Sequence, residues 1–238
     1  MTPLRLAPLA ILVAAITASA QNIQVNKENR TIAVTATDKV TVLADTATVH
    51  IGFIVYGPDS DWAYATGSRL SNAIIKALTD AEIPADAIES ENQNISPVQD
   101  YQLEKLTAAE RVQKRFQVTQ SWTVRTAADD AAKVLDLAVK AGANQSGQIE
   151  WSFKDEHAPE SEAAGKALTG ARARAQLMAT SLNAKLGVLL FASNQTQAES
   201  IRPMAAAKMT MEQQAEPLAI SPRQIEKSAT VYAVFAIE

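Results

Sequence analysis

The chain of 238 residues contains no cysteine, only eight glycines and 5% aromatic residues. Without cysteine it has no disulfide framework, no thiolate zinc site, no iron–sulfur cluster and no cysteine nucleophile. The formal net charge of −4 argues against a protein that binds nucleic acid through its phosphates. Hydrophobic residues make up 47% of the chain, which argues against intrinsic disorder. We therefore expect a folded, mildly acidic protein.

The beginning of the chain has the pattern of a secretory signal peptide. Arg5 supplies a positive charge, an apolar run covers residues 9–16, and residues 18–20 form a small-x-small cleavage motif. The apolar run is shorter than the roughly 20 residues that cross a bilayer. We predict that the leader, residues 1–20, is cleaved between Ala20 and Gln21. The mature chain would then be periplasmic or secreted, without a transmembrane span, and the lack of cysteine suits an oxidising compartment.

Alternation of apolar and polar residues predicts seven strands. The clearest case is the strand over 47–56, in which every odd position is apolar. The first strand is expected over 31–37, with a turn at Asp38-Lys39 and a continuation over 40–42. The other expected strands cover residues 88–97, 116–126, 148–153, 188–193 and 228–237.

Helical periodicity predicts three helices that are rich in alanine. The first follows residues 57–60, which break the strand and offer an N-cap, and it ends before Pro84; the second ends at Gly142. The third covers residues 160–186. Its expected buried stripe consists of Ala164, Leu168, Ala171, Ala175, Met178, Leu182 and Leu186.

These elements follow each other in the order β-β-α-β-β-α-β-α-β-β. The predicted fold class is α+β, with a mixed, largely antiparallel sheet and the three helices packed on one of its faces. We expect residues 21–238 to form a single domain. Two polar stretches, near 102–114 and 194–226, are expected to be mobile excursions from it.

Four stretches resemble motifs of the SIMPL-domain family, which includes bacterial periplasmic immunogenic and oxidative-stress-defence proteins. They are Thr31-Ile-Ala-Val-Thr-Ala with Leu43-Ala-Asp-Thr-Ala-Thr-Val, Leu78-Thr-Asp-Ala-Glu-Ile-Pro-Ala-Asp-Ala-Ile-Glu-Ser, Ala138-Val-Lys-Ala-Gly-Ala-Asn, and Ala171-Arg-Ala-Arg-Ala-Gln-Leu-Met-Ala with Leu186-Gly-Val. The sequence departs from the family pattern at Ala44, where proline is usual, and at Ala81-Glu82, where Leu-Gly is usual.

The resemblance extends over residues 31–237. It implies a fold, a location in the cell envelope and, in some members, assembly into large ring-like or channel-like oligomers. Some members are linked to protection against oxidative stress. The resemblance implies no settled reaction, because its motifs mark turns and helix ends. Asp45, within the first motif, is expected to shape the turn into the strand that follows.

The two histidines, His50 and His157, are the first candidates for a site. His50 lies in the long strand, where a surface or packed polar role is the simpler interpretation. His157 lies in the acidic segment 154–162, which indicates either a weak cation site or carboxylates that favour a helix N-terminus. No Gly-x-Ser-x-Gly elbow and no phosphate-binding glycine loop is present. We therefore assign no catalytic, cofactor-binding or metal-binding residue, and no cofactor.

Two further groups of residues have alternative interpretations. Lys166, Arg172 and Arg174 on the third helix form either an anion-binding patch or a solvated helix face. The methionines of the segment 204–211, together with its glutamines, suggest a sacrificial oxidation target, a Cu(I) site or a simple flexible loop.

We weigh three functions for such a chain. The first is a non-enzymatic envelope protein that acts through self-assembly or an envelope partner, with a role in envelope or oxidative-stress defence. The second is a binding module for a small envelope ligand, either a glycan, a lipid or a metal ion. The third, an enzyme, lacks any specific signature in the sequence. We favour the first, with a homo-oligomer and no nucleic acid among its partners.

Overall fold

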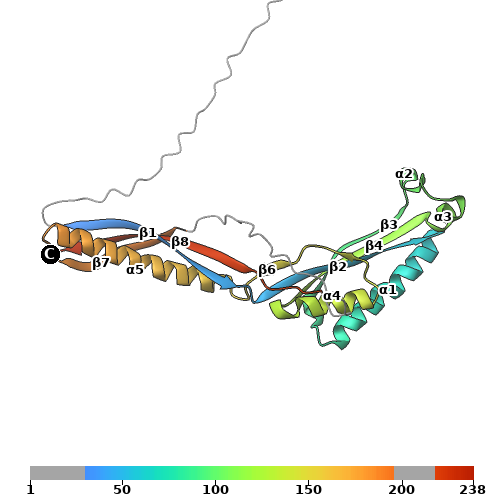
Figure 1. Cartoon of the computed structure of the whole chain (residues 1–238), viewed down its shortest axis with the longest axis horizontal. Helices are drawn as coiled ribbons and strands as arrows, with labels where there is room; N and C mark the ends of the chain where they lie inside the picture. Colours follow the sequence, from blue (N-terminus) through green and yellow to red (C-terminus); the bar gives the residue numbers. More distant parts are fainter. Residues whose placement is uncertain (1–29, 196–217) are drawn as a thin grey trace, which may run out of the picture.

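The computed structural model describes residues 30–195 and 218–238 of the chain. The predicted leader and the methionine segment 204–211 lie outside these residues. The α+β class is confirmed, since the helices pack on antiparallel sheets. The strands form two sheets, however, where a single one was expected. The two sheets lie end to end in an elongated molecule, each with its own helices (Figure 1).

The first sheet, sheet A, combines the beginning of the chain with its end. Its order is β1-β8-β7, and all neighbouring strands are antiparallel. The helix α5 covers one face of this sheet. The elements of this half are β1 (Thr31–Leu43), α5 (His157–Ser181), β7 (Leu186–Gln195) and β8 (Gln224–Ile237).

The second sheet, sheet B, has the order β3-β4-β2-β5, and β6 also pairs with β2. Both α1 and α4 pack on its strands, and they lie on the same side of it (Figure 1). Its strands are β2 (Thr46–Gly57), β3 (Ile88–Pro97), β4 (Phe116–Ala127), β5 (Gln145–Ser146) and β6 (Glu150–Ser152). Its helices are α1 (Ser60–Asp80), α2 (Asp100–Leu103), α3 (Ala108–Gln113) and α4 (Ala131–Lys140), with 3-10 turns at Ala85–Ala87 and Ala128–Asp130.

The core of sheet B follows the alternation of the sequence. Ala47, Val49, Ile51 and Phe53 are all buried beneath the two helices, as predicted. The rings of Phe53 and Trp122 lie 5.9 Å apart and extend the core across β2 and β4. The Asp59 side chain accepts a hydrogen bond from the Trp62 N–H and begins α1 as an N-cap.

The core of sheet A is built on alanine, and here the predicted stripe of α5 is partly wrong. The buried residues of this helix recur every four positions and are Pro159, Ala163, Ala167, Ala171, Ala175 and Ala179. Met178 and Leu182 belong to the predicted stripe but are 45% and 64% exposed. Small side chains let the helix backbone approach the sheet closely. The longer side chains therefore lie outside the contact.

Three further differences concern strand ends and excursions. Asp38-Lys39 is no turn, because both residues continue β1 and pair with Ala229 and Ser228 of β8. The excursion expected near 102–114 contains the short helices α2 and α3, which join β3 to β4. Within the stretch 194–226, residues 194–195 end β7 and residues 224–226 begin β8, while residues 218–223 belong to no helix or strand. No helix of the described residues is long and apolar enough to cross a membrane.

Candidate functional site

His50 lies between two carboxylates on the face of sheet B that α1 and α4 leave open. Its Nδ1 is 3.3 Å from Glu91 Oε1, and its Nε2 is 3.5 Å from Glu150 Oε1. Only 21% of the His50 side chain is exposed. The three side chains therefore link β3, β2 and β6 across the sheet.

The backbone explains why these side chains meet. Glu91 is the extra residue of a bulge in β3, since the pairing with β4 shifts between Ser90 and Asn92. Glu150 begins β6 opposite Thr48 of β2. The loop between β5 and β6 passes so close that a Cβ on Gly147 would meet His50 Cβ at 2.8 Å. Glycine is thus required where the loop crosses the imidazole.

This arrangement is a bridge of side chains. Each imidazole nitrogen faces a different carboxylate, so the three groups do not converge on one point. Within residues 30–195 and 218–238, no cluster of three or more histidine or carboxylate side chains could hold a metal ion. The bridge can tie strands together, and it offers no obvious ligand position.

His157 lies apart from His50, because it begins α5 in the other half of the molecule. Its side chain is 89% exposed, and its Nδ1 is 3.8 Å from Glu160 Oε2. The neighbouring carboxylates order the start of the helix: Asp155 Oδ1 accepts from the His157 N–H, and Glu156 Oε1 accepts from the Phe153 N–H. Of the two interpretations of this acidic segment, the geometry favours the one in which its carboxylates stabilise the start of the helix.

The basic residues of α5 do not act as one patch. Lys166 forms an ion pair of 2.9 Å with Glu162 one turn earlier, and Arg174 donates to the Thr35 carbonyl of β1. Arg172 is exposed on the same helix. Two of the three cations are thus engaged within the protein itself.

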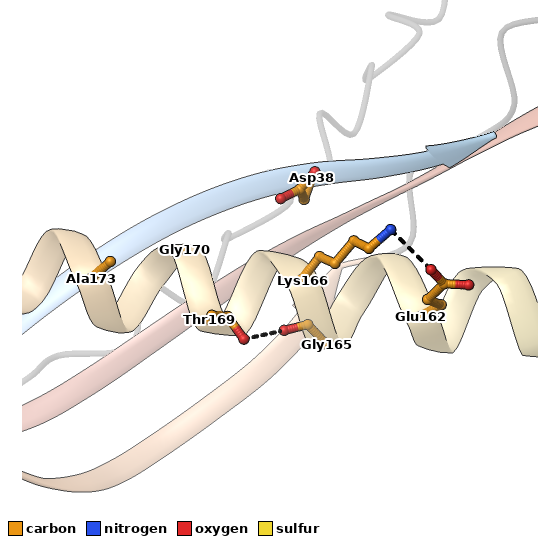
Figure 2. A pocket seen from close by; sticks show the side chains of 7 residues that line it. All are labelled: Asp38, Glu162, Gly165, Lys166, Thr169, Gly170 and Ala173. Atoms are coloured by element: carbon orange, nitrogen blue, oxygen red, sulfur yellow. Dashed lines mark hydrogen bonds and ion pairs between the residues drawn. The ribbon is translucent and has the colours of Figure 1, made fainter.

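A shallow, open groove of about 630 Å³ lies on α5 (Figure 2). Asp38 of β1 borders it, with Glu162, Gly165, Lys166, Thr169, Gly170 and Ala173 of the helix. Its polar groups are engaged within the protein: Lys166 pairs with Glu162, the Thr169 hydroxyl donates to the Gly165 carbonyl, and Asp38 Oδ1 accepts from the Lys39 N–H.

The surface that sequence reasoning missed is the strand β7. This strand is an edge of sheet A, and its apolar side chains face outward instead of into a core. Val188 is 69% exposed and Leu190 is 52% exposed, with Leu189 and Phe191 also open to solvent. Apolar side chains at the end of α5, namely Leu177, Met178 and Leu182, are exposed as well. An unbroken apolar run is typical of a buried strand, so the run itself gives no signal of this exposure.

The fold and the surfaces define an α+β protein of two helix-covered antiparallel sheets with an open apolar edge. The chain matches the SIMPL family model, described as "Protein of unknown function (DUF541)", over residues 32–235. The match covers most of the chain, so the protein belongs to the SIMPL family, as its sequence motifs predict. A search of the curated proteins finds no match.

Proposed function

We propose that the protein acts without catalysis, by assembling with further copies of itself along β7, the edge strand of sheet A. The single observation that carries the proposal is the apolar character of this exposed edge strand. An edge strand presents unpaired N–H and C=O groups that can pair with a strand of another chain. Natural proteins usually block such an edge with charged residues or proline, and β7 contains neither.

A second copy of β7 is a suitable partner for this strand. The sequence of β7 is uncharged, so two copies can lie side by side without electrostatic repulsion. Antiparallel pairing about a two-fold axis would join two copies of sheet A into one continuous sheet. Because the pairing of β7 with β8 shifts register twice, the strand is bent. We therefore expect apolar side-chain contacts to contribute alongside the strand pairing.

The exposed end of α5 supports the same interface. The helix packs against β7, and Leu177, Met178 and Leu182 are exposed at its end. Exposed apolar residues that cluster in this way are typical of protein interaction surfaces. Association that covers them would remove apolar area from water and stabilise the assembly.

The proposal extends to the place and the role of this assembly. The leader pattern supports export to the periplasm or the medium after cleavage at Ala20/Gln21. Family resemblance supports a role in the cell envelope, including defence against oxidative stress. The sequence supports a non-enzymatic role, since it has no nucleophile elbow and no phosphate loop. The mass of the N-terminal peptide of the exported protein tests the cleavage.

Light scattering of the purified mature protein tests the assembly. The 25.5 kDa chain becomes a monomer of about 23 kDa once the leader is removed. We expect the wild type to form oligomers at micromolar concentration, and the double variant Val188→Lys/Leu190→Lys to be monomeric. Thr41→Lys is the matched control, because Thr41 is exposed on β1, the opposite edge strand of sheet A.

Two outcomes would overturn the proposal. One is a wild type that stays monomeric throughout the micromolar range. The other is an oligomer that the double variant forms as readily as the wild type, since the contact would then lie elsewhere. Circular dichroism and a urea titration of each variant show whether it is folded. A change in mass can then be assigned to the interface.

A further inference from the structure

The open face of sheet B carries a ladder of amide and hydroxyl side chains. The helices α1 and α4 lie on the other face of this sheet, over the buried positions of β2 and β4 (Figure 1). On the open face, three residues of β3 stand directly opposite three residues of β4. The pairs are Asn92 with Ser121, Asn94 with Thr119, and Ser96 with Gln117. We call these six residues the polar ladder.

The polar ladder keeps much of its hydrogen-bonding capacity free. Asn94 and Gln117 both donate to the Ser96 hydroxyl, at 3.2 and 3.3 Å. The side chains of Asn92, Thr119 and Ser121 form no hydrogen bond with the rest of the described chain. Asn92 and Asn94 are exposed, because β3 is the edge strand of the sheet. Each amide offers both donors and acceptors to a ligand.

The strand β2 continues this face beside the ladder. Gly52 stands opposite Ser121, Ile54 opposite Thr119 and Tyr56 opposite Gln117. A Cβ on Gly52 would meet the Gln120 carbonyl at 2.6 Å, so the two backbones approach closely at this position. The face is therefore low at Gly52, and the half-buried Ile54 adds an apolar side chain between Gly52 and Tyr56. Tyr56, with Lys114 Nζ 5.5 Å from its ring centre, provides an aromatic group at one end.

The lack of charge on this surface limits the classes of ligand that it can bind. The ladder itself has no charged residue, and the carboxylates of Glu91 and Glu150 border it beside His50. Nucleic acids and other polyanions need basic side chains, which the ladder lacks. Interfaces between proteins are enriched in aromatic residues, methionine and arginine and depleted in serine, unlike this composition. A neutral chain of hydroxyl groups fits both the charge and the mixture of donors and acceptors.

We propose that the polar ladder, with Gly52 and Tyr56, binds an uncharged carbohydrate chain. Sugar hydroxyls would exchange hydrogen bonds with the free amides and hydroxyls of the ladder. The Tyr56 ring would pack against the apolar side of a sugar ring, as its amphipathic character allows. The site lies in the other half of the molecule from β7, so it does not depend on the assembly proposed above.

Affinity electrophoresis of the mature protein tests this site. Native gels would contain dextran, laminarin or mannan as neutral polysaccharides, and alginate as an anionic one. We expect at least one neutral polysaccharide to retard the wild type, and alginate to have no effect. For Asn92→Ala/Asn94→Ala we expect an affinity at least about tenfold lower. The matched control is Gln93→Ala, which alters the opposite face of the same strand and should bind like the wild type.

A second variant, Thr119→Lys, places a bulky charge within the ladder and should also lose binding. It keeps the test valid if the double variant fails to fold. The proposal is wrong if no neutral polysaccharide retards the wild type, if alginate is bound preferentially, or if folded ladder variants bind as the wild type does. The monomeric Val188→Lys/Leu190→Lys variant should retain binding, which separates the carbohydrate site from the assembly surface.

Discussion

Asp45 and Lys154 are joined by a hydrogen bond of 2.7 Å, in which the Lys154 N–H donates to Asp45 Oδ1. Asp45 lies between β1 and β2, and Lys154 lies between β6 and α5, so both residues belong to passages between the two sheets. The same carboxylate oxygen accepts from the Thr46 hydroxyl at 2.9 Å, and the Asp45 carbonyl accepts from the Ala128 N–H. One residue thus ties together the two passages.

Replacing Asp45 by alanine should weaken this junction. The Lys154 N–H and the Thr46 hydroxyl both lose an acceptor, and we expect a loss of about 1–2 kcal/mol in the free energy of unfolding. Asp45→Asn is the matched control, since its amide oxygen still accepts and we expect it to lose less. The difference is measured from the midpoints of urea denaturation, with one slope of unfolding free energy against urea concentration used for all variants. Equal losses in the two variants would show that the hydrogen bonds are not what Asp45 contributes.

The buried alanines of α5 lead to a second prediction. Ala171 is fully buried against sheet A, so leucine at this position would push the helix away from the strands. We expect Ala171→Leu to lower the free energy of unfolding by about 1–3 kcal/mol. Ala173→Leu, on the exposed side of the same helix, should have little effect. If thermal or urea unfolding showed similar stability for both variants, α5 would not pack as closely as its alanines indicate.

The sequence predicted which residues of a strand face the core, but it did not predict that the strands form two sheets. The alternation in 47–56 is local, so it correctly assigns the buried face of β2. Two sheets arise because β1 pairs with β8, at the opposite end of the chain, and no local pattern specifies such a partner. In α5, hydrophobicity alone predicts that Met178 and Leu182 are buried. The helix approaches the sheet so closely, however, that the buried positions are taken by alanine.

The surroundings of the candidate residues depended on features that spacing does not reveal. His50 meets Glu91 only because a bulge displaces that residue in β3, and it meets Glu150 only because β6 returns to β2. The exposed edge of β7 was missed for a similar reason. Whether an apolar strand is central or at an edge depends on the strand order of the whole sheet.

Two helical glycines should respond to alanine in opposite directions. A Cβ on Gly67 of α1 would meet Val118 Cγ1 at 2.9 Å and Phe53 Cε2 at 3.4 Å, so Gly67→Ala should overpack the core and lower the melting temperature. A Cβ on Gly165 of α5 would meet nothing within 4 Å. Gly165→Ala should therefore gain about 0.5–1 kcal/mol from helix propensity and raise the melting temperature. Calorimetry of the two variants checks this, and shifts of the same sign would contradict it.

The helix α3 should lose its order in acid before the rest of the protein. The pKa of Glu110 is lowered from 4.5, first by the Thr107 N–H, then by the Thr107 hydroxyl, with Lys114 contributing less. The Glu110 carboxylate accepts both hydrogen bonds, at 2.8 and 2.7 Å, and completes the capping box of α3. Because the folded pKa lies below the unfolded one, the stabilisation is fully present above about pH 4.5 and is lost as the pH falls through the folded value.

Nuclear magnetic resonance shifts of α3 and α1, followed through an acid titration, measure this difference. We expect the helical shifts of α3 to decrease below pH 4.5 while those of α1 persist, since α3 has no buried residue to hold it. Glu110→Gln keeps a side chain that can accept from Thr107 but has no carboxyl group to titrate. Its α3 shifts should stay constant over the same range. A wild type in which both helices unfold together, or a Gln variant that follows the wild-type titration, would show that Glu110 does not control the order of α3.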